Sequence, residues 1–129
     1  MSLRDGTLRA PSRNDELLFG GTMSTAPKSE ILKLTEMVGY QDAAVVSRQI
    51  TKTEAGNVTL FAFDKDQGLT EHTAPFDALV HILEGEAQIT ISGKPFDLKT
   101  GDAIIMPANE PHALKATRRF KMLLTMIRA

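Results

Sequence analysis

Histidine is the residue type in this chain best suited to chemistry, and it occurs at His72, His81 and His112. An imidazole can bind a first-row transition metal through a neutral nitrogen, or it can act as a general base near neutral pH. The chain has no cysteine, so any metal must be held by histidine and carboxylate. No Ser-His-Asp pattern, phosphate-binding glycine loop or paired-carboxylate signature indicates another chemistry.

The stretch before His112 predicts how this histidine is positioned. Gly101 begins a turn, residues 103–106 read as a short apolar strand, and Pro107 and Pro111 bound a loop. The loop delivers His112 to the start of the next strand.

The elements around these residues are predicted to be short strands. Apolar and β-branched runs alternate with Gly, Pro, Asn and charged turn residues, and a tight hairpin is predicted at Ser92-Gly93-Lys94-Pro95. Because no helices separate the strands, the pattern favours an antiparallel sandwich or barrel over a parallel α/β sheet. The predicted strands are 45–51, 58–63, 77–83, 87–92, 96–98, 103–106, 112–116 and 120–127.

The N-terminal part of the chain has a different character. Residues 1–28 show no periodicity and are predicted to be a flexible N-terminal arm. From Ser29, a candidate N-cap, apolar residues recur at helical spacing until Gly39, which predicts one short helix or turn. Residues 29–129 are expected to form a single domain.

The bulk composition excludes several function classes. The 129-residue length fits one hydrophobic core, and 15 basic residues nearly balance 16 acidic ones, so a nucleic-acid partner is not expected. No run approaches the roughly 18 apolar residues of a membrane span, and the first residues lack the apolar core of a signal peptide. We expect a cytoplasmic protein without a membrane partner.

The stretch ending at His112 resembles the second sequence motif of the cupin family. That motif has a Gly, a Pro, a second Gly, a His and an Asn at fixed spacing. Gly101, Pro107 and His112 match it, Asn109 replaces the second Gly, and Ala116 replaces the final Asn. Asn109 is a mild change, because Asn tolerates a left-handed backbone.

A weaker resemblance to the first cupin motif lies upstream. His72 takes the place of the first of two histidines, Ala74 that of the second, and Ala78 that of the glutamate. Asp77 lies beside the lost glutamate, but adjacent strand residues face opposite ways, so it could replace the glutamate only if Pro75 introduced a bulge. Together the motifs imply an all-β fold, the double-stranded β-helix of small RmlC-like cupins (a jelly-roll barrel).

The resemblance implies a site inside the barrel. His72 and His112 become candidate ligands of one divalent transition metal (Fe, Mn, Ni or Zn), held weakly for lack of an inward carboxylate, and a metal-free site is the alternative. If Ala78 faces the interior, His81 points outward. The predicted ligand-binding residues are His72, Ala74, Ala78, Val80, Ile82, Met106 and His112.

Competing functions remain open at this point. An apolar pocket with two placed imidazoles suits a small-molecule binding protein, and the alternative is a metal-dependent cupin enzyme of the dioxygenase or isomerase type using His72 and His112. The resemblance also implies a homodimer, with Phe61, Phe63 and Leu79 expected on an apolar outer face.

Overall fold

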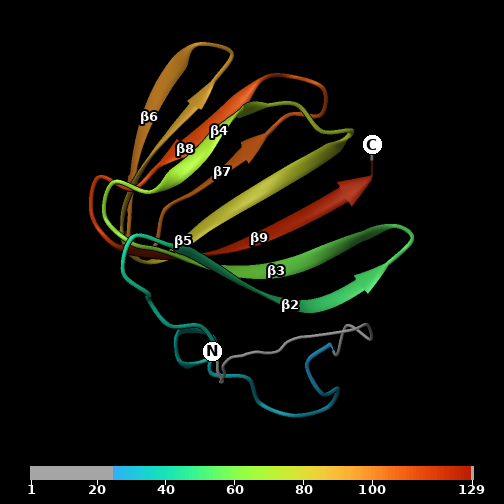
Figure 1. Cartoon of the computed structure of the whole chain (residues 1–129). Coiled ribbons are helices and arrows are strands. Elements are labelled where there is room, and N and C mark those ends of the chain that lie inside the picture. Colours follow the sequence, from blue (N-terminus) through green and yellow to red (C-terminus); the bar gives the residue numbers. More distant parts are fainter. Residues whose placement is uncertain (1–24, 129) are drawn as a thin grey trace.

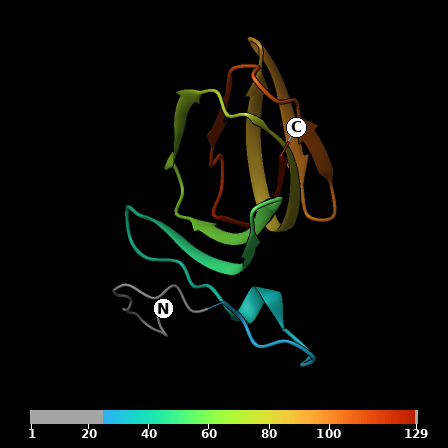
Figure 2. The ribbon, with the colours of Figure 1, turned by 90° about the vertical axis from the view of Figure 1, so that its right-hand side faces the viewer.

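The computed structural model describes residues 25–128, which form two facing antiparallel sheets that share one long strand (Figures 1 and 2). The first sheet has the order β2-β3-β9-β5-β7, and the second has the order β4-β8-β5-β6. The strands are β2 (Val45–Thr53), β3 (Gly56–Phe63), β4 (Gly68–His72), β5 (Phe76–Ile91), β6 (Lys94–Lys99), β7 (Ala103–Met106), β8 (His112–Lys115) and β9 (Phe120–Arg128). This architecture is the jelly-roll barrel that the resemblance implies, and it agrees with the antiparallel sandwich or barrel predicted from the strand pattern.

The long strand β5 belongs to both sheets because it bends at Gly85. The backbone of Gly85 has φ +88°, and its pairing with β9 shifts register between Ile82 and Glu84. A Cβ at Gly85 would lie 1.9 Å from the carbonyl oxygen of Arg119. Only glycine permits so close a crossing of two backbones. The sequence pattern divides β5 into two strands at this bend.

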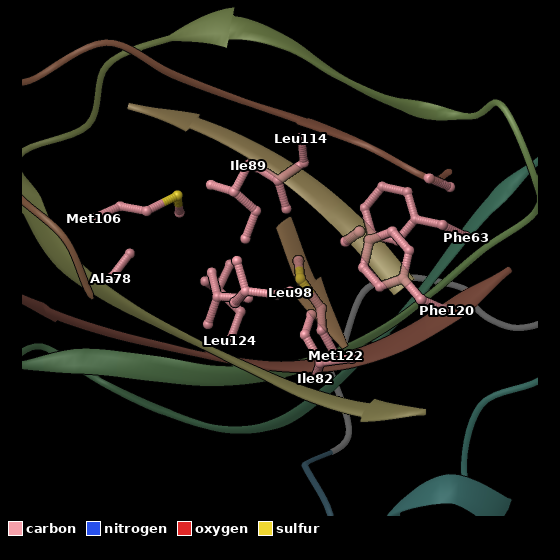
Figure 3. Close-up of a cluster of buried hydrophobic side chains, with 13 residues drawn as sticks. Phe63, Ala78, Ile82, Ile89, Leu98, Met106, Leu114, Phe120, Met122 and Leu124 are labelled. Carbon is pink, nitrogen blue, oxygen red and sulfur yellow. The ribbon is translucent and has the colours of Figure 1, made fainter. Parts of the chain in front are cut away.

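The interior between the sheets is a packed apolar core (Figure 3). At the end of the barrel next to the bend, the rings of Phe63 and Phe120 stack with centroids 4.4 Å apart. Val80, Ile82 and Ile89 have no solvent-accessible surface. The sequence-based expectation that Phe61 and Phe63 lie on the outer face is wrong, because both side chains pack in this interior cluster.

The outer face of the first sheet is partly covered by the chain's own N-terminal segment, which we define as residues 25–40 (Figure 2). Ala26 is buried, and its amide donates to the carbonyl of Ile50 at 2.8 Å. Leu60 and Ala62 pack against this segment. They lie on the face of β3 opposite to Phe61 and Phe63. The strand is therefore covered on both sides.

The short helix or turn predicted after Ser29 is a single turn in the structure. Only the 3-10 turn η1 (Leu34–Glu36) forms, its N-cap residue is Lys33, and Ser29 lies in a turn with φ +62°. Of the predicted arm 1–28, residues 1–24 lie outside the described part of the chain. Within residues 25–128, no helix has the length and hydropathy needed to cross a bilayer.

Candidate functional site

The structure brings His72 and His112 together, although 40 positions separate them. His72 is the last residue of β4 and His112 the first of β8, and the two are register partners. Their Nε2 atoms lie 3.2 Å apart, and their ring centroids lie 4.4 Å apart with an interplanar angle of 72°. We call these two rings the imidazole pair.

The pair lies at the end of the barrel remote from the Gly85 bend, which we call the histidine end. His112 is paired with Ile91, the last residue of β5, whereas Gly85 is paired with Phe120 at the opposite end. The two halves of β5 diverge from the bend toward the histidine end (Figure 1). The site therefore lies where the sheets separate.

Hydrogen bonds to backbone carbonyls determine which nitrogens carry protons. Nδ1 of His72 lies 2.7 Å from the carbonyl oxygen of Thr70, and Nδ1 of His112 lies 3.2 Å from that of Glu110. A carbonyl oxygen can only accept, so each Nδ1 is assigned the proton and donates it. In the neutral rings both Nε2 atoms then carry lone pairs.

Two lone pairs that face each other across 3.2 Å repel unless a positive centre lies between them. A proton on one ring supplies such a centre, and so does a metal ion bonded to both nitrogens. Zinc, for example, binds imidazole nitrogen at about 2.0–2.1 Å, so one ion can bond two nitrogens at this separation. The arrangement fits a divalent metal.

The two rings differ in burial. His112 is only 4% exposed, whereas His72 is exposed to solvent. Burial lowers the pKa of His112, the nearby His72 lowers it further, and the carbonyl of Glu110 opposes the shift. A lowered pKa keeps His112 neutral near pH 7, the form that can bind a metal or accept a proton.

Within the described part of the chain, no third protein ligand accompanies the pair. Among residues 25–128, no group of three or more His, Cys, Asp or Glu side chains is placed to hold one metal ion. His81 pairs with Leu123 and Ala103 on the outer face, as the alternation of strand residues predicts. Glu84 accepts a hydrogen bond from Tyr40 at 2.6 Å.

Asp77 does not substitute for the glutamate of the first cupin motif. Its register with β9 is regular from Phe76 to Ile82, so no bulge turns its exposed carboxylate inward. Asp77 Oδ1 instead accepts the amide of Ala108 at 2.9 Å. Sequence reasoning missed this role, whose only signal was a carboxylate at the start of a strand.

The hydrogen bond of Asp77 is one of several that hold the loop before His112, residues 107–111. Asn109 has φ +67°, as its place in the motif predicts, and its amide donates to the carbonyl of Ala74 at 2.8 Å. The Ser92 hydroxyl donates to Glu110 at 2.8 Å. These bonds fix the carbonyl of Glu110, which in turn orients the His112 ring.

The remaining predicted lining residues lie in or near the core. Ala78 and Met106 are register partners with 3% exposure each, and Ala74 lies in the loop before β5. Because Val80 and Ile82 have no accessible surface, no water-sized space adjoins them. A ligand at the histidine end would reach these two only by displacing packed side chains.

A surface hollow of about 580 Å³ lies at the bend end, lined by Lys65, Gly85, Thr117, Arg118 and Arg119. Its cations are largely neutralised, because Arg119 donates to Asp64 at 2.8 Å and Arg118 lies 3.6 Å from Glu86. The turn arginines Arg118 and Arg119 thus pair with acids. The imidazole pair is the better candidate site.

Comparisons with known proteins agree with this fold. The cupin-domain family model matches residues 59–127. A conserved protein of unknown function from Streptococcus pyogenes superposes with a TM-score of 0.77, at 34% identity over 84% of this chain and 96% of that chain. A cupin superfamily protein from Desulfitobacterium hafniense gives 0.76, at 28% identity over 84% of this chain and 100% of that one.

A cupin 2 conserved barrel domain protein from Leptotrichia buccalis gives a TM-score of 0.73, at 40% identity over 75% of this chain and 47% of that chain. No curated protein matches. The family model covers more than half of the sequence. The chain belongs to the cupin family.

Proposed function

We propose that this cupin binds a small organic molecule at the histidine end, through a divalent transition metal held between Nε2 of His72 and Nε2 of His112. The observation that carries the proposal is the 3.2 Å separation of these atoms, with each Nδ1 hydrogen-bonded to a backbone carbonyl. Such carbonyl partners fix ring orientation in metal-binding histidines.

The small molecule would supply the donors that the protein lacks. With two protein nitrogens, an ion keeps several open positions, so its affinity for the protein alone is modest. A ligand with two oxygen donors would occupy those positions, and its carbon skeleton would lie against the apolar wall at Ala78 and Met106. When bound, the ion supplies Lewis acidity toward a ligand oxygen.

Catalysis at the same pair is the second candidate. The lowered pKa of His112 keeps its ring neutral near pH 7, the state required of a general base. A metal-dependent enzyme of the dioxygenase or isomerase type would instead use His72 and His112 as metal ligands, and the general base would serve a metal-free isomerase. Turnover of a bound ligand would distinguish this function from simple binding.

The test measures metal content in protein purified without a histidine tag. We expect about one equivalent of Fe, Mn, Ni or Zn in the wild type after reconstitution, and its loss in both His72→Ala and His112→Ala. His81→Ala is the matched control, because this histidine lies on the outer face and should leave the metal content unchanged. Equal metal content in all four proteins would refute the proposal.

Binding of a small molecule is tested by a separate measurement. Oxalate is a suitable probe, because it offers two oxygen donors and little else. With the metal present, oxalate should raise the melting temperature of the wild type and of His81→Ala, but not of His72→Ala. Equal shifts in all three proteins would show that oxalate does not bind at the imidazole pair.

A further inference from the structure

Lys94, the first residue of β6, carries a cation on the same inner face as the imidazole pair. The strand register places it there, because Lys94 is paired with Ile91 and Ile91 with His112. His112 is in turn paired with His72. Paired residues of a sheet share a face, so these residues form one inward row across the end of the second sheet, from β6 to β4 (Figure 1).

The side chain of Lys94 is exposed, but its end is held over the inner wall of the barrel. Its Nζ lies 5.4 Å from the centroid of the Phe96 ring, and Phe96 packs against the apolar core. The face of an aromatic ring attracts a cation, so this contact keeps the ammonium at the mouth of the barrel. Within residues 25–128, no carboxylate forms an ion pair with Lys94.

The wall between Lys94 and the imidazole pair is apolar. Two strand spacings, about 10 Å in all, separate the backbone of Lys94 from that of His112. Ile91 lies between them in the row, and both Ile91 and Phe96 pack against the core. A molecule bound by the metal at one end would therefore cross an apolar stretch before its other end met a cation.

We infer that the ligand of this site is a small diacid. One carboxylate and a neighbouring oxygen bind the metal between His72 and His112, a short carbon chain lies against Ile91 and Phe96, and the second carboxylate pairs with Lys94. The inference rests on the proposed function, because the metal holds the first end of the ligand. It adds a charge requirement at the second end.

The carboxylates that the chain itself places at the histidine end leave this cation to the ligand. Glu110 accepts a hydrogen bond from the Ser92 hydroxyl at 2.8 Å, and Asp77 accepts one from the Ala108 amide at 2.9 Å. Both acids are thus engaged in holding loops.

Arg128 is an inward cation at the edge of the facing sheet. Its guanidinium lies 5.5 Å from the Phe76 ring, and its Nε donates to the carbonyl of Glu54 at 3.1 Å. Arg128 is paired with Phe76 in the first sheet, whereas Lys94 belongs to the row that contains both histidines. Lys94 is therefore the better placed partner for the second carboxylate.

The test compares two acids of equal chain length by isothermal titration calorimetry of the full-length protein reconstituted with zinc. 2-Oxoadipate carries the second carboxylate, and 2-oxohexanoate ends in a methyl group instead. We expect the wild type to bind 2-oxoadipate about three- to tenfold more tightly, a modest factor because the ion pair is exposed. Lys94→Met should bind both acids as the wild type binds 2-oxohexanoate.

Lys99→Met is the matched control. Lys99 lies on the same strand, but its side chain is on the outer face, where its register partner is Glu86. This variant and Arg128→Met should both keep the wild-type preference for 2-oxoadipate. Melting curves of the three variants, recorded without ligand, confirm that each remains folded.

The outcomes separate this inference from the proposed function. Equal binding of the two acids by the wild type, or a preference that persists in Lys94→Met, would overturn the inference and leave the metal site standing. A preference lost in Arg128→Met but kept in Lys94→Met would move the second carboxylate to the other sheet and would also overturn it. A wild type that binds neither acid would refute ligand binding at the imidazole pair, and the inference would fall with it.

Discussion

The substitution Gly85→Ala tests the bend that allows β5 to serve both sheets. The added Cβ would lie 1.9 Å from the Arg119 carbonyl oxygen and 2.7 Å from the Cα of Phe120. Both obstacles are backbone atoms inside the sheet, so neither can rotate away. The strand crossing itself must open.

The expected cost has two parts. A φ of +88° penalises alanine by about 1 kcal/mol relative to glycine. Forcing the backbones apart adds about 1–3 kcal/mol, as overpacking does in other cores. The free energy of unfolding should therefore fall by about 2–4 kcal/mol, out of the roughly 5–15 kcal/mol typical of a domain.

Two other glycines separate these parts. Gly93 has φ +80° with nothing within 4 Å of its added Cβ. Gly93→Ala should therefore carry only the penalty of the positive φ, about 1 kcal/mol of unfolding free energy. Gly39 also has open space, and its φ lies outside the left-handed region. Gly39→Ala should be neutral or stabilise by up to about 1 kcal/mol.

Urea denaturation followed by circular dichroism measures all three variants. The transition midpoint should fall in the order Gly39→Ala, Gly93→Ala, Gly85→Ala, with an unchanged denaturant slope. If Gly85→Ala were no less stable than Gly93→Ala, the reasoning would be refuted, because the close crossing at Arg119 would then impose no constraint.

Three further predictions concern single contacts. Asp77→Ala should speed hydrogen exchange of the Ala108 amide and lower the free energy of unfolding by about 1 kcal/mol, whereas unchanged exchange would show that the 2.9 Å contact does not form. Because the pKa of His112 is lower in the folded protein than its ordinary 6.5, the unfolded chain binds more protons near that pH. The free energy of unfolding should therefore be greatest above pH 6.5 and fall on acidification below it. In urea titrations at several pH values, His112→Asn should remove part of this pH dependence. An identical pH dependence in the variant would contradict the prediction. Tyr40→Phe should cost about 1–2 kcal/mol in urea denaturation, since Glu84 loses a donor at 2.6 Å, and a neutral result would refute that assignment.

The strand pattern was predictable because turns punctuate it chemically. The Ser92-Gly93 turn has φ values of +48° and +80°, the left-handed pair that a tight hairpin requires. Asn109 likewise takes the positive φ that its motif position demands. Local residue chemistry determines such turns, so a sequence reveals them.

Strand β4 could not be predicted in the same way. Of its residues Gly68–His72, only Leu69 is even partly buried, so no hydrophobic alternation marks it. It becomes a strand by pairing with β8, whose partner residues lie 40 to 47 positions away. That pairing, and not local propensity, positions His72.

The orientation of β3 illustrates a different limit. Alternation correctly divides the strand into two apolar faces, but it does not say which face is inside. Phe61 and Phe63 turn inward because Phe120 stacks within the barrel, while residues 25–40 cover the other face. Both determinants are distant in sequence.

For the candidate site, motif spacing predicted the two histidines but not the state of their rings. The proton positions follow from the carbonyls of Thr70 and Glu110, whose directions depend on loop geometry. Which ring nitrogens carry lone pairs is therefore a property of the fold, and residue types alone do not reveal it.

The most direct test of this account is a long-range ¹H–¹⁵N NMR spectrum of the histidine rings, recorded as zinc is added to untagged protein. We predict that both rings carry their proton on Nδ1, and that the Nε2 resonances of His72 and His112 shift together and saturate at one equivalent. His81 should not respond. A proton on Nε2 of both rings, or a zinc response confined to one ring of the pair, would contradict the account.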